Sequence, residues 1–349
     1  MNSEWQDFLS STGAQIENGI MQPFNSPQQE AKTASGQTTI TALSHLGLIQ
    51  VGGADAASFL QNQFTNDIRE VTDNSSQLSA WCSPKGRALA CFRLFIMAEH
   101  YYMLLPASLV ASTRERLARY ILMSKVTLEE SSNKLATMGV AGPEADALLN
   151  KLFTTLPART NEVCHHEGCT LLRIPGPSPR FAITGEPVRL IALWSTLSSD
   201  AQPVGSDCWR LLDIQAGLPS VYPETVEAFV PQMLNLQAID GLSFSKGCYP
   251  GQEVVARMQY LGKLKRRMYR AVVDTDAAPV PGDTLRIAGG DQGTGKIVDA
   301  HPAAQGGYEL LAVVEIAAVE AAEKICLEKD NEAILTFVDL PYPVAESES

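Results

Sequence analysis

The segment from Lys246 to Glu253 reads Lys-Gly-Cys-Tyr-Pro-Gly-Gln-Glu, and it restricts the local backbone while carrying several reactive side chains. Pro250 suits the first position of a helix, because its missing N–H would have no intrahelical partner there. Val254 and Met258 then recur at helical spacing, and Gly262 supplies a stop. The pattern predicts a helix that begins at Pro250.

Cys248 would lie beside the positive end of this helix and two residues from the ammonium of Lys246. That combination lowers the pKa of a thiol and favours thiolate. The alternative is that Cys248 is a small buried apolar residue, as free cysteines often are. The neighbouring glycines and lysine favour function, so Cys248 and Lys246 are the candidate catalytic residues.

The length of 349 residues exceeds the usual size of one hydrophobic core and predicts two or three domains. With 45% hydrophobic and 19% charged residues, the composition is that of an ordinary globular protein. Apolar runs stay far shorter than the roughly 18 residues of a membrane-spanning helix. Because the N-terminus also lacks a basic start followed by an apolar run, we expect a cytoplasmic protein without a membrane partner.

The seven cysteines are scattered and form no Cys-x-x-Cys pair, which argues for free thiols. Cys164, His165, His166 and Cys169 would be a zinc site only if their side chains met. Glu167-Gly168 suits a hairpin turn, and strand alternation would send the two histidines to opposite faces. We therefore predict no metal site.

The formal net charge of -12 opposes a protein that coats nucleic acid over its whole surface. One stretch differs, because it contains six basic residues and no acidic one. On an acidic chain such a stretch suits an anionic ligand or partner, although a solvated helix end and strand start would explain it equally well. Its members are Arg257, Lys263, Lys265, Arg266, Arg267 and Arg270.

Composition and periodicity divide this α+β chain into three parts. Residues 1–36 are rich in Ser, Gln, Asn and Pro and predict a flexible extension. Residues 37–265 form the main region; within it, about 135–200 read as strand, helix, hairpin, strand and helix, as in a ferredoxin-like subdomain. Residues 266–349 contain short strands between Gly- and Pro-rich turns, which predict a small antiparallel barrel or sandwich and a tail.

The motif with its following Val-Val-Ala-Arg resembles the signature of the YgfZ-type folate-binding proteins, which are related to the T-protein aminomethyltransferase (GcvT) of glycine cleavage. The resemblance covers about residues 40–345. Further matching segments follow in the family's order: Val51-Gly52-Gly53-Ala54-Asp55, Lys85-Gly86-Arg87, Ser124-Lys125-Val126, Ala216-Gly217-Leu218-Pro219 and Pro231-Gln232-Met233-Leu234-Asn235-Leu236.

This resemblance implies a three-part, cloverleaf-like fold that holds tetrahydrofolate or a folate derivative in the 37–265 region. It also implies a role in assembling or repairing iron-sulfur enzymes, with effects that reach tRNA modification. Iron-sulfur enzymes or assembly factors would then be partners, and any link to tRNA would be indirect.

The resemblance also transfers site residues. Cys248 and Lys246 would lie close to the folate, with Tyr249 and Arg257 of the motif beside it, and Trp209 would stack on the pterin. Two further positions depart from the family. Gln215 stands where the relative has a pterin-contacting carboxylate, and Leu46 stands where some members have an aromatic residue.

The aminomethyltransferase has an aspartate pair shortly after the glycine that matches Gly86, and acid/base work on its carrier needs such a carboxylate. Here the stretch from Arg87 to Phe92 contains none. We therefore expect a folate-binding accessory protein of iron-sulfur metabolism and not an ordinary aminomethyltransferase. A one-carbon transferase for another substrate and a tRNA-interacting protein are the alternatives.

Overall fold

The computed structural model describes residues 1–260 and 262–344, and the chain divides into two compact units. The first unit contains Met1–Phe59, Ile68–Gln77 and Phe92–Leu212. The second contains Leu60–Asp67, Leu78–Cys91 and the chain from Asp213 onward. Residues 345–349 of the predicted C-terminal region lie outside the described residues, and no described helix combines the length and apolar character needed to cross a membrane.

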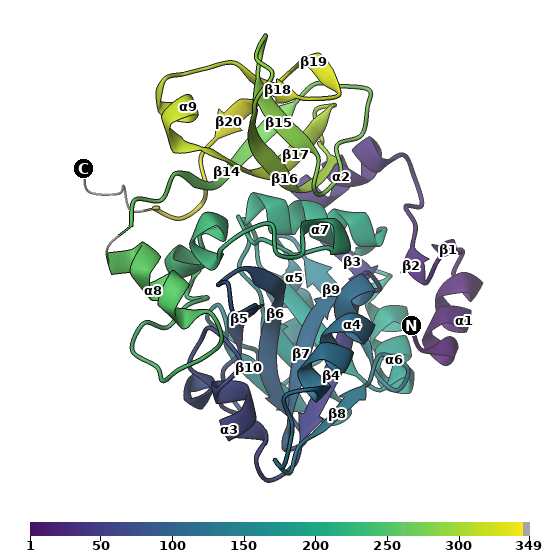
Figure 1. The fold of residues 1–349 in the computed structure, drawn as a ribbon. Coiled ribbons are helices and arrows are strands. Elements are labelled where there is room, and N and C mark those ends of the chain that lie inside the picture. Colours follow the sequence, from purple (N-terminus) through teal and green to yellow (C-terminus); the bar gives the residue numbers. More distant parts are fainter. Residues whose placement is uncertain (261, 345–349) are drawn as a thin grey trace. The chain divides into compact units, whose positions relative to one another are not determined.

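The first unit contains a mixed sheet with the strand order β10-β11-β12-β9-β3-β13. Its strands β3, β9 and β10 are labelled in Figure 1. The predicted order of strand, helix, hairpin, strand and helix is confirmed. In a ferredoxin-like sheet β13 would pair with β9, but here the early strand β3 lies between them. The bounds are β3 (Thr39–Ala42), β9 (Ala136–Ala141), α5 (Ala145–Asn150), β10 (Val163–His166), β11 (Cys169–Arg173), β12 (Arg180–Gly185), α6 (Pro187–Leu197) and β13 (Gln202–Pro203).

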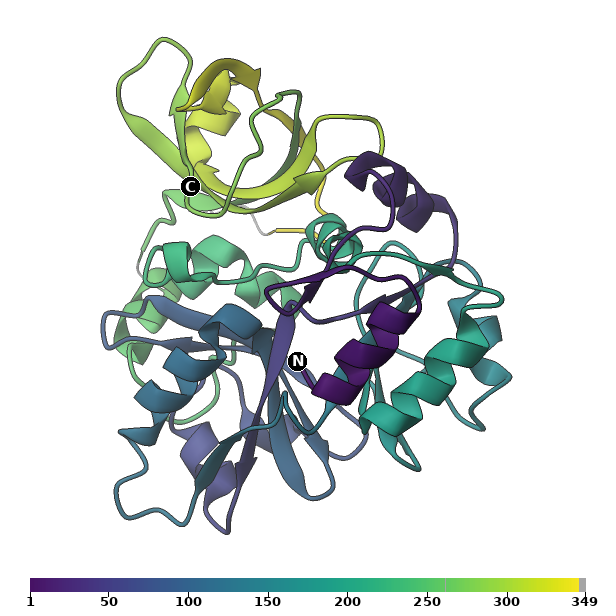
Figure 2. The same cartoon turned by 90° about the vertical axis from the view of Figure 1, so that its right-hand side faces the viewer.

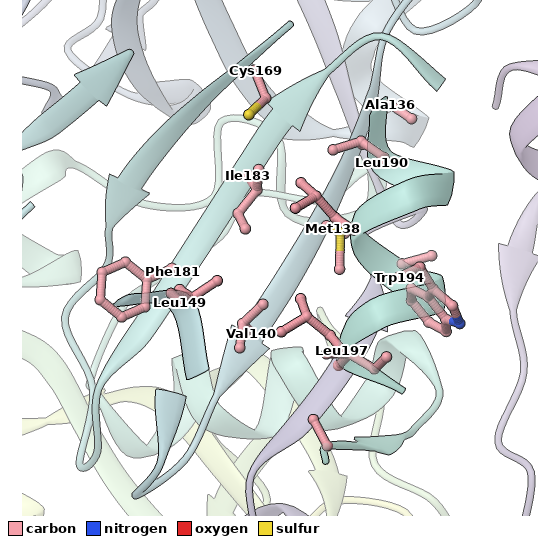
Figure 3. Close-up of a cluster of buried hydrophobic side chains, with 14 of the residues drawn as sticks. Ala136, Met138, Val140, Leu149, Cys169, Phe181, Ile183, Leu190, Trp194 and Leu197 are labelled. Carbon is pink, nitrogen blue, oxygen red and sulfur yellow. The ribbon is translucent and has the colours of Figure 1, made fainter. Parts of the chain in front are cut away.

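The core of this unit lies between the sheet and α6 (Figure 3). Met138 and Val140 on β9 and Ile183 on β12 are fully buried there. Leu190 and Trp194 recur four residues apart on α6, so one face of the helix covers the sheet. Pro187 starts α6 where its missing N–H costs no hydrogen bond.

Residues 1–36 are folded, which differs from the expected flexible extension. They form α1 (Ser3–Ser11), β1 (Ile16–Glu17), β2 (Ile20–Met21) and α2 (Pro27–Gly36). Trp5 is 1% exposed and packs edge-on against Trp194, with ring centroids 5.7 Å apart. Trp5 and Leu9 anchor α1 in the core, and the polar residues around them concealed these contacts in the composition.

A second sheet has the order β5-β6-β7-β4-β8. Its strands and the helices near them in sequence are β4 (Leu46–Gly52), α3 (Ala56–Gln61), the 3-10 helix η1 (Ile68–Glu70), β5 (Gln77–Cys82), β6 (Ala88–Met97), β7 (His100–Pro106), α4 (Ala107–Ala118) and β8 (Thr127–Glu130). The residues Ser83-Pro84-Lys85-Gly86 between β5 and β6 are typical of a turn, and they form one, since the Gly86 N–H donates to the Ser83 carbonyl at 2.8 Å.

The second unit carries a curled antiparallel sheet with the order β19-β18-β15-β16-β17-β14-β20 (Figure 2). This half-barrel confirms the predicted C-terminal β structure, and Leu285, Ile297 and Leu310 are fully buried in its core. The bounds are β14 (Arg266–Val273), β15 (Thr284–Ile287), β16 (Gly293–Pro302), β17 (Tyr308–Glu315), α9 (Ile316–Glu320), β18 (Ile325–Leu327), β19 (Asp330–Ile334) and β20 (Thr336–Val338).

In the sequence between β13 and β14, all the described elements are helices. They are α7 (Ser206–Gln215), the 3-10 helices η2 (Pro223–Thr225), η3 (Pro231–Leu234) and η4 (Leu236–Ile239), and α8 (Gln252–Tyr260). The predicted start of α8 at Pro250 is wrong by two residues, because Gly251 adopts a positive φ of 80°. Three residues therefore separate Cys248 from the first residue of the helix.

Candidate functional site

Cys248 is exposed in the loop before α8, and it is the only exposed cysteine among the seven, all of which lie in the described part of the chain. Burial raises the pKa of the Cys91 thiol to about 12. Burial also raises the pKa of Cys82, with a further contribution from Cys91, and that of Cys208, beside Glu30. Only Cys248 therefore presents a fully accessible thiol to a partner or ligand.

Two glycines hold the Cys248 loop against the turn between β5 and β6. A Cβ on Gly251 would lie 2.4 Å from the Ser83 carbonyl oxygen, and one on Gly86 would lie 2.7 Å from the Val254 Cβ. Both glycines also have positive φ angles, which other residues rarely adopt. The two backbones can approach this closely only because neither position carries a side chain.

Lys246 lies beneath the loop and is 5% exposed. Its Nζ donates to the carbonyl oxygens of Gln61 (2.6 Å), Asn66 (3.0 Å) and Phe64. The ammonium also lies 5.2 Å from the ring centroid of Tyr249, close enough for a cation–π contact. The lysine predicted to be catalytic thus ties the motif to residues 61–66.

The same short segment is also bound to the chain just before the motif. The Asn66 side-chain amide donates to the carbonyls of Leu78 (3.0 Å) and Asp240 (2.6 Å). The Thr65 hydroxyl donates to the Gly241 carbonyl at 3.0 Å. Because these polar groups are buried and paired, the base of the Cys248 loop is rigid.

Gln215, at the end of α7, is oriented by a buried carboxylate. Its Nε2 donates to Glu309 Oε2 at 3.1 Å, and the other Glu309 oxygen accepts from Arg270. Since a carboxylate only accepts, the Gln215 atom that faces it must be the amide nitrogen. The Gln215 carbonyl oxygen, which accepts no hydrogen bond from the described residues, is left for a ligand that donates.

Trp209 lies in the first unit and is 3% exposed. The Arg180 guanidinium lies 4.7 Å from its ring centroid, and a Cβ on Gly139 would lie 2.5 Å from its six-membered ring. The ring is therefore closely packed in the structure. Its stacking on a pterin stays a prediction.

The remaining predicted folate contacts differ in exposure. Leu46 is half-buried at the start of β4 and lines a small cavity of about 30 Å³ with Trp5. Tyr249 is 5% exposed, and burial raises the pKa of its hydroxyl. Arg257 is exposed on α8. Cys248, Lys246, Tyr249, Arg257 and Gln215 belong to the second unit, whereas Trp209 and Leu46 belong to the first.

The basic stretch is not a uniform patch. Arg266 pairs with Glu315 at 2.6 Å, Arg270 pairs with Glu309, and the Arg267 guanidinium lies 4.9 Å from the Tyr269 ring centroid. Lys263 and Lys265 are exposed. Much of its positive charge is thus neutralised or packed within the half-barrel.

The two adjacent histidines lie in the predicted hairpin, where His166 pairs with Cys169 in register. His165 Nε2 lies 2.7 Å from the Asp73 carbonyl oxygen, and His166 Nε2 lies 2.8 Å from that of Thr155. The described residues contain no group of three or more His, Cys, Asp or Glu side chains placed to hold a metal ion. Backbone contacts account for both histidines.

The sequence interpretation missed Glu309 and its role beside Gln215. A signal was present, because Glu309 is the one charged residue in the otherwise mostly apolar stretch from Tyr308 to Val314. A carboxylate that is 5% exposed in a strand must be paired to offset the cost of burial. Its partners Arg270 and Gln215 are far away in sequence, so only the fold reveals them.

Comparison with known proteins agrees with this architecture. Residues 18–240 match the model of the GCVT N-terminal domain, a segment that ends before Lys246. The aminomethyltransferase T of the glycine cleavage system from Bartonella henselae superposes with a TM-score of 0.73 at 18% identity, covering 97% of this chain and 96% of that one. The predicted α+β fold of the aminomethyltransferase type is confirmed.

Curated relatives extend over nearly the whole chain. The tRNA-modifying protein YgfZ of Sodalis glossinidius is 33% identical over 310 residues, which cover 88% of this chain and 94% of that protein. The protein of the same name from Pectobacterium carotovorum is 32% identical over 326 residues, covering 93% and 97%. The chain therefore belongs to the YgfZ family of proteins with a GCVT N-terminal domain.

Proposed function

We propose that this chain is a folate-binding accessory protein that uses the exposed Cys248 thiol to support assembly or repair of iron-sulfur enzymes, including tRNA-modifying ones. The observation that carries the proposal is the exposure of this one thiol on a rigid, buried base. A cysteine kept exposed while five others are buried and Cys164 is partly buried is suited to chemistry with a partner. The relatives' name, tRNA-modifying protein, supports the link to tRNA modification.

The donor and acceptor set around Gln215 fits a folate. A pterin presents ring N–H and amino donors along one edge, and the Gln215 carbonyl is an acceptor held ready for them by Glu309. Gln215 would hold the pterin through this carbonyl oxygen. Bound tetrahydrofolate would supply a carrier for one-carbon units.

The amide contact is weaker than the carboxylate contact it replaces, because a charged acceptor roughly doubles the strength of a hydrogen bond. Glu309 and Arg270 offset part of this loss by fixing the amide before the ligand arrives, which removes the cost of ordering the side chain. We infer that this chain keeps folate binding at reduced pterin affinity.

An ordinary aminomethyl transfer is not favoured. The carboxylate needed near Gly86 is absent from residues 87–92, and Ala88 is occupied in backbone pairing with Phe229 and Glu227. The tRNA-interacting alternative also loses support, because three of the six basic residues are paired or packed.

The test compares Cys248→Ser with Cys164→Ser, a partly exposed cysteine outside the motif. Each variant is returned to cells that lack the chain, and the activity of an iron-sulfur tRNA-modifying enzyme is measured. We expect Cys248→Ser to lose nearly all support and Cys164→Ser to keep it, at equal protein levels. Full support by Cys248→Ser would remove the thiol from the function. Turnover of a methylene- or formyl-folate by the purified chain alone would instead favour a transferase.

A further inference from the structure

A cavity of about 220 Å³ lies in the second unit, and its lining includes neither Cys248 nor Gln215. The lining combines the cations Arg87, Arg266 and Lys296 with the apolar side chains Phe229, Met233 and Val313. We propose that this cavity binds a small dianionic group, a carboxylate pair or a phosphate, on a short apolar stem.

The charges at the cavity are not balanced. Arg266 is paired with Glu315, but Arg87 and Lys296 form no ion pair with any described residue, and no carboxylate is among the described lining residues. Both unpaired cations are exposed. On a chain with a net charge of -12, they concentrate positive potential at a concave site, which attracts an anion.

Arg87 is held in place while keeping donors available. Its Nη1 donates to the carbonyls of Glu227 (3.2 Å) and Ala228 (2.9 Å). A guanidinium has five N–H donors, so Nε and Nη2 retain theirs for an oxyanion. A guanidinium that is already fixed along one edge can form paired hydrogen bonds to a carboxylate or phosphate with little further loss of side-chain conformational entropy.

The strand beside the cavity carries a bulge. Gly293 and Gly295 on β16, two residues apart, oppose the adjacent residues Arg286 and Leu285 on β15. Gly293, Gly295 and the following Lys296 all line the cavity. Bulges occur preferentially beside binding and active sites, where they redirect a side chain, and this one precedes the Lys296 ammonium.

The volume limits the ligand. Sites for whole drug-sized molecules measure roughly 300–1,000 Å³, so this cavity suits a head group and not a complete cofactor. Two unpaired cations match two negative charges, and the apolar lining matches a short methylene stem. The inference is independent of the folate proposal, since the probes below contain no pterin.

The test is calorimetric titration of the full chain with glutarate and with inorganic phosphate, using neutral glutaramide as the uncharged control. We expect a dissociation constant on the order of 1 mM for at least one dianion, weakening with salt, and no binding of glutaramide. Tighter binding of glutarate would indicate a carboxylate pair as the natural group, and tighter binding of inorganic phosphate would indicate a phosphate. Arg87→Gln and Lys296→Gln should each weaken binding by roughly tenfold.

Lys263→Gln, an exposed lysine of the basic stretch outside the cavity lining, should bind like wild type. Lys296→Glu should abolish binding. Because the Lys296 side chain is exposed, the variant protein should unfold at the same temperature as wild type. The proposal is overturned if neither dianion shows saturable binding at ligand concentrations well above roughly 1 mM. It is equally overturned if the Lys296 and Lys263 variants bind alike.

Discussion

The two units differ in how they treat groups that could meet a ligand. In the first unit, Trp209 is 3% exposed beneath Arg180, and Leu46 lines a cavity of only about 30 Å³. In the second unit, Cys248 is exposed, Gln215 keeps an acceptor, and a cavity of about 220 Å³ carries unpaired cations. Trp209 and Leu46 are thus packed in the first unit, whereas Cys248 and Gln215 in the second keep groups that a ligand or partner can meet.

The second unit keeps these groups open by fixing what lies beneath them. Lys246 is saturated by carbonyl oxygens, Gly251 locks the loop against the Ser83 carbonyl, and Glu309 orients Gln215. Cys248 and Gln215 are thus positioned by supporting residues, which are Lys246, Gly251 and Glu309, through contacts within the protein. Changes to the supports should lower stability, and changes to the open groups should lower binding or function alone.

The largest stability effect is expected for Lys246→Met. The change leaves the buried carbonyls of Gln61, Phe64 and Asn66 without their charged donor, which should lower the free energy of unfolding by roughly 3 to 5 kcal/mol. Urea denaturation measures it. Lys263→Met, at an exposed position, should change stability little, and equal effects of the two variants would show that Lys246 is not a support.

A smaller loss of roughly 3 kcal/mol is expected for Gly251→Ala, because alanine resists the positive φ and its Cβ would clash with the Ser83 carbonyl. Gly247 offers a matched control in the same motif, since a Cβ there would meet nothing within 4 Å. Gly247→Ala should unfold like wild type. If both variants had the same urea midpoint, the packing of the loop against the turn would carry no stability.

The orientation of Gln215 is tested by exchanging charges. Glu309→Gln frees the amide to turn, and Gln215→Glu places two carboxylates face to face, so each should weaken tetrahydrofolate binding by about tenfold. The double variant Gln215→Glu/Glu309→Gln restores a donor opposite an acceptor and leaves a charged acceptor for the pterin, so its affinity should return at least to that of wild type. Additive losses in this double-mutant cycle would rule out the coupling.

The smallest expected effect concerns Tyr342, whose hydroxyl donates to the Gly217 carbonyl at 2.8 Å. Burial, partly offset by a hydrogen bond with Asn235, raises the pKa of Tyr342 to about 12 from an ordinary value of 10.0. The unfolded chain then loses the proton first, so this tyrosine's contribution to stability is present below pH 10.0 and is lost toward pH 12. Unfolding free energies across this range should fall less steeply for Tyr342→Phe than for wild type.

Much of the fold followed from the sequence where local pattern decides structure. The second helix expected within residues 135–200 is α6, where Pro187 and the four-residue spacing of Leu190 and Trp194 are local features, and the Ser83–Gly86 turn likewise has residues typical of a turn. The insertion of β3 between β9 and β13 was not readable, because strand pairing over long separations leaves no local pattern. The start of α8 was misplaced because Gly251 serves packing and not helix formation.

The candidate site was only partly predictable for a related reason. Cys248 carried a local signal in its neighbours, and the structure shows it exposed, while its catalytic role stays a prediction. The roles of Lys246 and Gln215 depend on Gln61, Asn66 and Glu309, which come from distant segments. Side chains that act through long-range hydrogen bonds become visible only when the chain is folded.

The proximity of Cys248 to a bound folate is tested by the rate at which iodoacetamide alkylates this thiol in the purified full chain as tetrahydrofolate is added, with Cys164 as the internal reference. If the exposed thiol lies beside a folate site, the Cys248 rate should fall with folate concentration and reach a plateau, while the Cys164 rate stays constant. A Cys248 rate that is unchanged at every folate concentration would exclude a folate site beside this thiol.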